Sequence, residues 1–349
     1  MMQTKQVTIP ALVRVKKDAL DRIGIYARRQ QFTHIVLLYS QDLLPALLAR
    51  VTAGLAAEKV EILQQLPVSA ASFEQAVEFF RQIPSTTHAI IGVGGGKALD
   101  IAKYVAFLTR LPYIAAPTSL SNDGFCSPQS SLTVEDRRRS LPAAIPFGVV
   151  LDTEVCLRAP EILWLSGVGD LAAKLTAVAD WKLAFHANGD LVDDFAALLS
   201  DATVFQFIAR PVRDAEGVKL LGTALMLNGI AMALCGSSRP ASGAEHLISH
   251  ALDAHSARPR LHGLQVGIAT YLVSRLQNQS TDLIAGLFDA TGFWRAIAAD
   301  PFKRSEWLDA ARIAPTIKPG FYTVLSARDC MPEVERILAA DPRLQPCFV

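Results

Sequence analysis

Short apolar runs alternate with stretches of helical periodicity over the first 150 or so residues of the chain. In the helical stretch between 73 and 80, Phe73, Ala76, Val77 and Phe80 recur at the spacing of one helix face. Strands that alternate with helices and are apolar throughout indicate a parallel sheet with helices on both faces. The runs that predict buried strands are His34–Tyr39, Val60–Leu63, His88–Val93, Leu111–Ala115 and Phe147–Asp152.

The pattern changes after about residue 152, where long stretches rich in Ala and Leu begin. The stretches that predict helices are 161–187, 191–209, 214–236, 243–256 and 262–279. We therefore predict an α/β N-terminal domain with a Rossmann-like parallel sheet over 1–155 and an all-α C-terminal domain over 156–349. We expect the active site in the cleft between the two domains, with the Gly-rich turn described below at the carboxyl ends of the strands.

Composition narrows the class of protein. The chain has 34 Lys and Arg against 33 Asp and Glu, and 51% of its 349 residues are hydrophobic. Such a chain has enough apolar surface to fold, and it lacks the basic excess that nucleic-acid binding needs. Five cysteines without a C-x-x-C pair suggest reduced thiols in a cytoplasmic protein, and Met1–Gln6 contains no apolar signal core.

One segment, Leu220–Ser238, carries no charge and is long enough to be tested as a membrane span. It contains Thr223, Asn228 and three glycines. We therefore expect a buried central helix and no membrane insertion.

The third predicted strand leads into Gly94, Gly95 and Gly96, and a helix follows. Glycines at such a turn let the backbone approach a phosphate, and the N–H groups at the helix start point at the anion. The spacing matches neither G-x-G-x-x-G in a first βα turn nor a P-loop. A tight turn without a ligand is the alternative.

A loop rich in hydroxyl groups follows the next strand, over 118–128. It can offer hydrogen bonds to a pyrophosphate, a ribose or a substrate, although composition alone also fits a solvated turn. Two such loops after neighbouring strands favour a nucleotide site more than either loop does alone.

A second group of candidates lies in the helical half. His246 and His250 stand at i and i+4 on one helix face, Asp170 begins an apolar helix, and His262 opens another helix. Imidazoles with a carboxylate suit Zn²⁺ or a related divalent ion, and three protein ligands leave a position open for substrate or water. Hydrogen-bonded structural histidines are the alternative reading.

The chain resembles the sn-glycerol-1-phosphate dehydrogenase family, in the superfamily of iron-type alcohol dehydrogenases, glycerol dehydrogenase and dehydroquinate synthase. The matching segments appear in family order between about 90 and 263. They are GVGGGKALDIAK at 92–103, PTSLSNDG at 117–124, GVGDL at 167–171, SRPASGAEHLISHALD at 238–253 and LHG at 261–263.

The resemblance implies a role for each matched position. The three glycines would hold the pyrophosphate of NAD(H) or NADP(H), helped by Thr118, Ser119, Ser121 and Ser127. Asp170, His246 and His262 would bind one divalent metal, with zinc expected before nickel or iron. Asp123, Asp170 and His250 would contact the substrate.

The implied reaction is reversible hydride transfer that reduces dihydroxyacetone phosphate to sn-glycerol 1-phosphate. The alternatives are a related polyol or glycerol dehydrogenase, a cyclase like dehydroquinate synthase, or a nucleotide-binding scaffold without chemistry. Arg239 is a candidate for the substrate phosphate, with a salt bridge as its alternative. Residues 134–146 depart from the Lys-rich sequence usual in the family. The family also implies a homo-oligomer.

Overall fold

The computed structural model describes residues 7–349, so Met1–Gln6 lie outside the described residues. The chain forms two compact units, one ending at Ala159 and the other spanning Pro160–Val349. The boundary expected at 155/156 falls inside helix α5 (Thr153–Arg158).

The first unit is built on a six-stranded parallel sheet with the order β1-β8-β5-β4-β2-β3 in the described part of the chain. Every residue of β4, β5 and β8 is buried, as expected for strands covered on both faces. The strands are β1 (Leu12–Lys16), β2 (His34–Ser40), β3 (Glu61–Val68), β4 (Ala89–Gly94), β5 (Tyr113–Pro117) and β8 (Gly148–Asp152).

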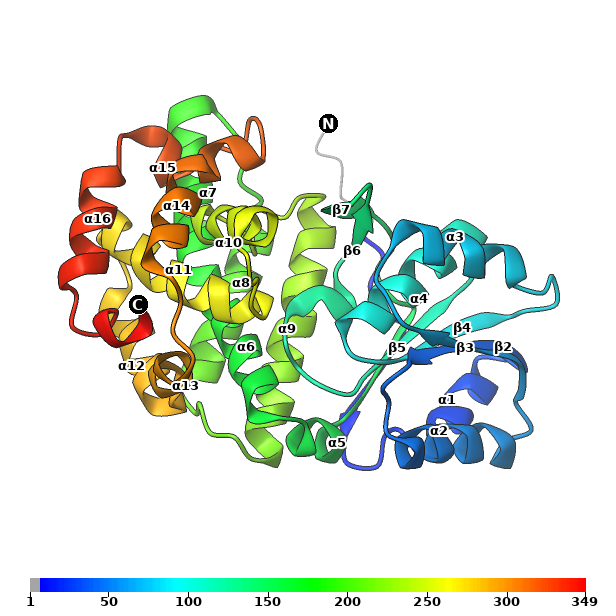
Figure 1. The fold of residues 1–349 in the computed structure, drawn as a ribbon. Helices are drawn as coiled ribbons and strands as arrows, with labels where there is room; N and C mark the ends of the chain where they lie inside the picture. The colour runs from blue at the N-terminus through cyan, green and yellow to red at the C-terminus, as the bar shows by residue number, and fades with distance from the viewer. Residues whose placement is uncertain (1–6) are drawn as a thin grey trace. The chain divides into compact units, whose positions relative to one another are not determined.

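Helices cover both faces of this sheet and create a separate apolar core on each (Figure 1). One core lies under α1 (Ile23–Arg29) and α2 (Pro45–Ala57), and the other under α3 (Phe73–Gln82) and α4 (Gly96–Thr109). The predicted inner face of α3 is wrong at one position, because Phe79 is buried whereas Phe80 is 40% exposed.

A β-hairpin that the hydrophobic pattern does not predict follows the hydroxyl-rich loop. Strands β6 (Gln129–Val134) and β7 (Arg137–Pro142) pair antiparallel around a two-residue turn. Glu135 and Asp136 both adopt positive φ, which is the geometry of a tight hairpin turn. The turn lacks the Gly or Asn that usually marks it in a sequence.

The second unit is helical, which confirms the predicted fold class. The long stretch predicted at 161–187 is two helices that break at Ala173. The helices are α6 (Glu161–Ala172), α7 (Lys174–Asn188), α8 (Asp194–Ile208), α9 (Ala215–Cys235), α10 (Ala244–His255), α11 (His262–Gln277), α12 (Thr281–Thr291), α13 (Phe293–Ala299), α14 (Arg304–Ile317), α15 (Val324–Ala327) and α16 (Met331–Ala340).

Two helical segments of this unit are long and apolar enough to cross a membrane by length and composition. They are Glu161–Asn188, with 83% of its apolar window buried, and Ala215–Cys235, with 56% buried. The second includes Asn228, which is fully buried. This burial is typical of core helices, and it supports the expectation that Leu220–Ser238 forms a buried central helix.

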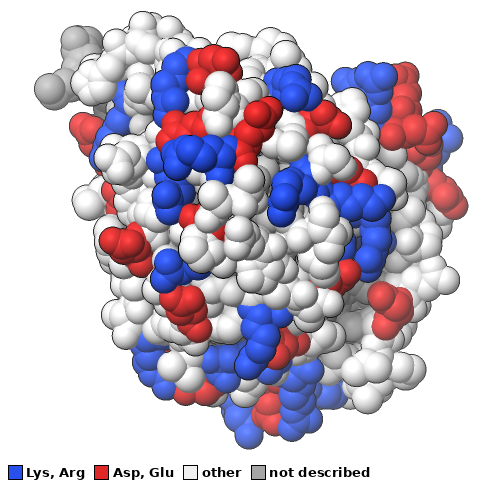
Figure 2. Space-filling model, turned by 60° about the vertical axis from the view of Figure 1, so that its left-hand side comes forward, with Lys and Arg blue, Asp and Glu red and all other residues white. Residues whose placement is uncertain are grey.

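Acidic and basic side chains are interspersed over the face drawn in Figure 2. Alternating signs at short range largely cancel beyond a Debye length. This face therefore presents no extended field of one sign.

Candidate active site

Three potential metal ligands meet inside the helical unit. Asp170 comes from α6, His246 from the first turn of α10 and His262 from the first position of α11. One ligand atom of each lies within 4.8 Å of the other two. Oδ1 of Asp170 is 3.6 Å from Nε2 of His246 and 3.7 Å from Nε2 of His262.

Small residues allow this meeting because α6 and α11 touch backbone to backbone. A methyl group at Gly263 would collide with the carbonyl oxygen of Ser166, and one at Gly169 would collide with the carbonyl oxygen of Gly263. The Ser166 hydroxyl also accepts a hydrogen bond of 3.2 Å from the Gly263 amide. The close contact brings Asp170 beside the start of α11.

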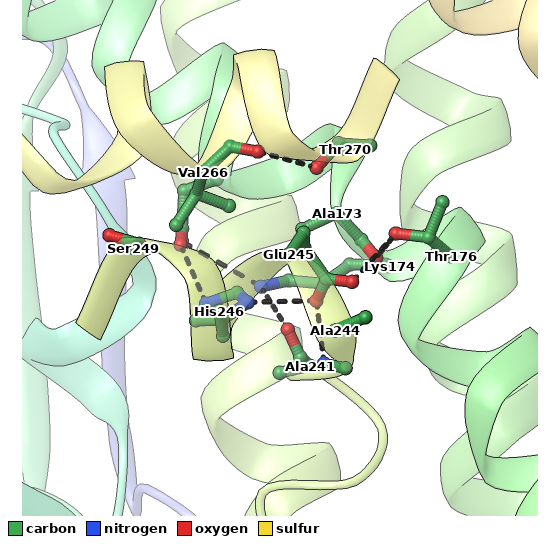
Figure 3. A network of polar contacts seen from close by, with 12 residues as sticks. Ala173, Lys174, Thr176, Ala241, Ala244, Glu245, His246, Ser249, Val266 and Thr270 are labelled. Carbon is green, nitrogen blue, oxygen red and sulfur yellow. Dashed lines mark hydrogen bonds and ion pairs between the residues drawn. The ribbon is translucent and has the colours of Figure 1, made fainter. Parts of the chain in front are cut away.

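The two oxygens of Asp170 face different partners. Oδ2 lies 3.7 Å from the ammonium of Lys174, which is fully buried and donates to the carbonyl of Ala241 at 3.2 Å (Figure 3). Burial raises the pKa of Asp170, but Lys174 and the two imidazoles outweigh burial and hold it below its usual range. Asp170 is therefore a carboxylate, with Oδ1 directed at the two imidazoles.

His246 is held on its other side by Glu245. Nδ1 of His246 lies 2.9 Å from Oε1 of Glu245, whose side chain is completely buried (Figure 3). Burial lowers the pKa of His246, but hydrogen bonds with Asp170 and Glu245 raise it overall to about 8.

His262 has a neutral partner instead. Its Nδ1 lies 3.3 Å from the hydroxyl of Ser249, which also accepts a hydrogen bond of 3.1 Å from the Gln265 amide. Both imidazoles thus turn Nδ1 away from Asp170 and Nε2 toward it.

This donor set fits a divalent metal. Ligands about 2.0–2.1 Å from a tetrahedral zinc ion stand about 3.4 Å apart, close to the separations found between Asp170 and the imidazoles. Two imidazoles with one carboxylate are also a borderline donor set that suits zinc, nickel or iron.

His250 lies beside these three residues. Its ring centroid is 5.9 Å from that of His262 and 6.3 Å from that of His246. The structure thus brings the four candidates of the helical unit together, with His250 at the edge of the cluster formed by Asp170, His246 and His262.

The glycine turn of the first unit lies where β4 ends and α4 begins. Gly94 has φ of 139°, and a methyl group there would collide with the hydroxyl of Ser40 at the end of β2. The Ser40 hydroxyl accepts a hydrogen bond of 3.1 Å from the Gly95 amide. Within residues 7–349, no atom lies within 4 Å of a methyl group built at Gly95 or Gly96. The turn is therefore rigid on its strand side and open on its helix side.

The hydroxyl-rich loop follows β5, the neighbour of β4. Thr118 and Ser119 are half-buried at its start, as are Ser121 and Asp123 further on. Ser127 differs from them, because it is buried and its hydroxyl contacts the carbonyl oxygens of Gly124 and Gln129.

A buried lysine holds this loop to α4. The ammonium of Lys103 donates to the Gly124 carbonyl at 2.6 Å and lies 3.3 Å from Oδ1 of Asp100. The contact fixes the short 3-10 helix Asp123–Cys126, which begins with a predicted substrate residue.

Arg239 is engaged in structural contacts. Its guanidinium donates to the carboxylate of Asp190 at 2.8 Å and to the Tyr322 carbonyl at 2.6 Å, and it packs over the ring of Phe321. These contacts favour the salt-bridge alternative over a phosphate contact.

The sequence did not reveal the buried charged residues that contact Asp170, His246 and the start of α10. The signal that could have found it is charge within apolar helices, since buried charges need partners. The residues concerned are Lys174, Asp180 and Glu245, all fully buried.

Known proteins place the chain in a family. Residues 14–160 match the family described as iron-containing alcohol dehydrogenase. The glycerol-1-phosphate dehydrogenase (NAD(P)+) of Aeropyrum pernix is 32% identical over 96% of this chain and 97% of its own length. The protein of the same name from Thermococcus sibiricus is 32% identical over 91% of this chain and 92% of its own length.

Solved structures share the fold at lower identity. Glycerol dehydrogenase from Schizosaccharomyces pombe has a TM-score of 0.76 at 20% identity and covers 99% of this chain and 92% of its own. A probable glycerol dehydrogenase from Sinorhizobium meliloti has a TM-score of 0.75 at 19% identity, covering 97% and 99%. The predicted family is confirmed by the near-complete alignments above: the chain belongs to the glycerol-1-phosphate dehydrogenase family.

Proposed function

We propose that the chain catalyses the reversible, metal-dependent and NAD(P)-linked reduction of dihydroxyacetone phosphate to sn-glycerol 1-phosphate. Two observations support the proposal. The chain aligns over nearly its whole length with a relative named glycerol-1-phosphate dehydrogenase, and the side chains of Asp170, His246 and His262 lie close together. A small phosphorylated three-carbon substrate follows from the same name. The polyol dehydrogenase alternative is less favoured, because relatives named glycerol-1-phosphate dehydrogenase align at 32% identity and the glycerol dehydrogenase structures at only 19–20%.

Asp170, His246 and His262 would hold the metal, for which we propose zinc. A divalent cation bound there supplies Lewis-acid polarisation of a carbonyl oxygen, and the reduced nicotinamide supplies the hydride. Burial of Asp170 beside Lys174 keeps one carboxylate oxygen directed at the site and the other engaged.

His250 is the proposed proton donor to the C2 oxygen of the product, directly or through an ordered water. Its ring centroid lies 6.3 Å from that of His246 and 5.9 Å from that of His262, so the ring stands beside the proposed metal ligands. We also assign Asp123 to substrate contact, at the start of the 3-10 helix that Lys103 holds.

The glycine turn would bind the cofactor pyrophosphate. The open helix side of Gly95 and Gly96 offers backbone N–H groups at the first turn of α4. Thr118, Ser119 and Ser121 are the proposed hydroxyl contacts, and Ser127 would act through the loop that it ties. The proposal extends to a cytoplasmic homo-oligomer.

The test is a substrate panel followed through the absorbance of the reduced nicotinamide. With zinc present we expect oxidation of NADH or NADPH by dihydroxyacetone phosphate and little turnover of glycerol. The product should resist a dehydrogenase specific for sn-glycerol 3-phosphate, which separates the two enantiomers. Failure to oxidise either cofactor with this substrate at saturating metal would overturn the proposal.

A further inference from the structure

We infer that Glu245 is a positioning residue that fixes the tautomer and orientation of His246 and thereby sets metal affinity. The inference rests on the proposed metal site and adds a residue that does not touch the metal. It begins from a contrast, because the two imidazoles of the site are supported differently.

The geometry at Glu245 determines which nitrogen of His246 carries the proton. A carboxylate only accepts hydrogen bonds, so the contact of 2.9 Å between Oε1 and Nδ1 requires the proton on Nδ1. The lone pair of a neutral ring then lies on Nε2, which is the nitrogen that faces Asp170. A carboxylate behind a metal-bound imidazole is a common way to orient the ring and raise its basicity.

Glu245 is itself immobilised. Its side chain is fully buried, Oε1 also accepts the Gly243 amide at 2.6 Å, and Oε2 lies 2.9 Å from the hydroxyl of Thr176 on α7 (Figure 3). Contacts with α7 and with the N-cap residue of its own helix leave the carboxylate little freedom to move away from His246. Its position is therefore a property of the packed unit.

His262 has a hydroxyl group, and not a carboxylate, at its Nδ1. A hydroxyl can donate or accept, so Ser249 does not select one tautomer of His262, and the contact is longer at 3.3 Å. We therefore expect His246 to depend on its partner much more than His262 depends on Ser249.

The experiment measures zinc affinity by competition with a fluorescent chelator, together with the absorption spectrum of the cobalt-substituted protein. Glu245→Gln should weaken zinc binding about tenfold and Glu245→Ala up to about a hundredfold. The cobalt spectrum should change in both variants. Ser249→Ala should weaken binding less than Glu245→Gln does.

Asp341→Asn is the matched control, because it removes another buried carboxylate of the same unit, one that pairs with Tyr271 and Arg275. It should lower thermal stability without changing zinc affinity or the cobalt spectrum. Unchanged zinc affinity and an unchanged cobalt spectrum in folded Glu245→Gln would overturn the inference, as would an equal loss of affinity in the control. If His246→Ala also leaves zinc affinity unchanged, it is the metal site itself that fails.

Discussion

The glycine turn and the metal-ligand cluster are constructed in opposite ways. The turn is made of backbone atoms. Gly94 packs against Ser40, whereas the space beside Gly95 and Gly96 is open. The cluster is made of side chains, and charged residues support two of its proposed ligands: Lys174 lies beside Asp170 and Glu245 beside His246.

The difference determines what each site tolerates. A backbone site depends on shape, so an added methyl group is the disturbance that matters. A buried polar site depends on the balance of charges and hydrogen bonds, because each group left without a partner costs about 1–3 kcal/mol or more. Substitutions can therefore separate the two sites.

The largest separation is expected from His246→Ala. Removing one of the three proposed ligands should lower turnover by about a thousandfold or more, because a metal held there would supply several kcal/mol of transition-state stabilisation. Nicotinamide binding, measured by fluorescence, should be retained. His255→Ala, on the exposed end of the same helix, is the control and should be nearly neutral. Turnover by His246→Ala after thorough chelation would show that the metal assignment is wrong.

The next effect concerns how the ligands are brought together. Gly263→Ala should destabilise the protein by about 3–4 kcal/mol, because its methyl group meets the Ser166 carbonyl, and backbone atoms cannot give way cheaply. Zinc affinity should fall as well, since His262 is the preceding residue. Gly286→Ala is the control, because its methyl group points into open space in a helix. Chemical denaturation of both variants measures the difference, and equal stability would contradict the tight contact.

Much of the first unit could be predicted because its strands are short, apolar and β-branched. The hairpin could not, because Glu135 and Asp136 adopt left-handed conformations that Gly or Asn usually signals. Strand β1 was also missed, since Leu12–Lys16 mixes apolar with charged residues at the edge of the sheet. Edge strands expose polar positions, so the apolar pattern weakens there.

The ligand residues could be proposed from spacing and family motifs, but their supporting charges could not. Glu245 lies inside the motif at 238–253 and Lys174 lies three residues after the motif at 167–171, where both resemble ordinary solvated charges of a helix. Only the fold shows that both are fully buried. Which charge is paired inside a helical unit depends on how the helices pack, and periodicity does not specify packing partners.

The buried carboxyl group of Asp180 should make the stability of the protein depend on pH. Burial and the neighbouring Glu245 raise its pKa to about 7, from 3.8. The folded state therefore retains a proton that the unfolded state loses between these values, so stability should fall as pH rises through this range and level off above it. The loss should be about 4 kcal/mol, because each pKa unit corresponds to about 1.4 kcal/mol.

Urea denaturation of the metal-free protein at several pH values measures this dependence. Asp180→Asn should remove most of the slope, although it also weakens the contact of Asp180 with the Ala244 amide. The difference between the two curves isolates Asp180 from His246, whose pKa of about 8 lies just above this range. Parallel curves would show that Asp180 is ionised throughout.

The smallest effect is expected at the backbone site. Gly95 has φ of −82°, which alanine adopts readily, and its methyl group would point into open space. Gly95→Ala should therefore keep the free energy of unfolding while weakening NAD(H) binding about tenfold, because the methyl group occupies space proposed for the pyrophosphate. Gly94→Ala should instead lower stability, since its φ of 139° and the nearby Ser40 hydroxyl both oppose a side chain. Isothermal titration of cofactor into Gly95→Ala decides the matter: an unchanged affinity would place the pyrophosphate elsewhere, and the turn would then be a structural strand-to-helix connection.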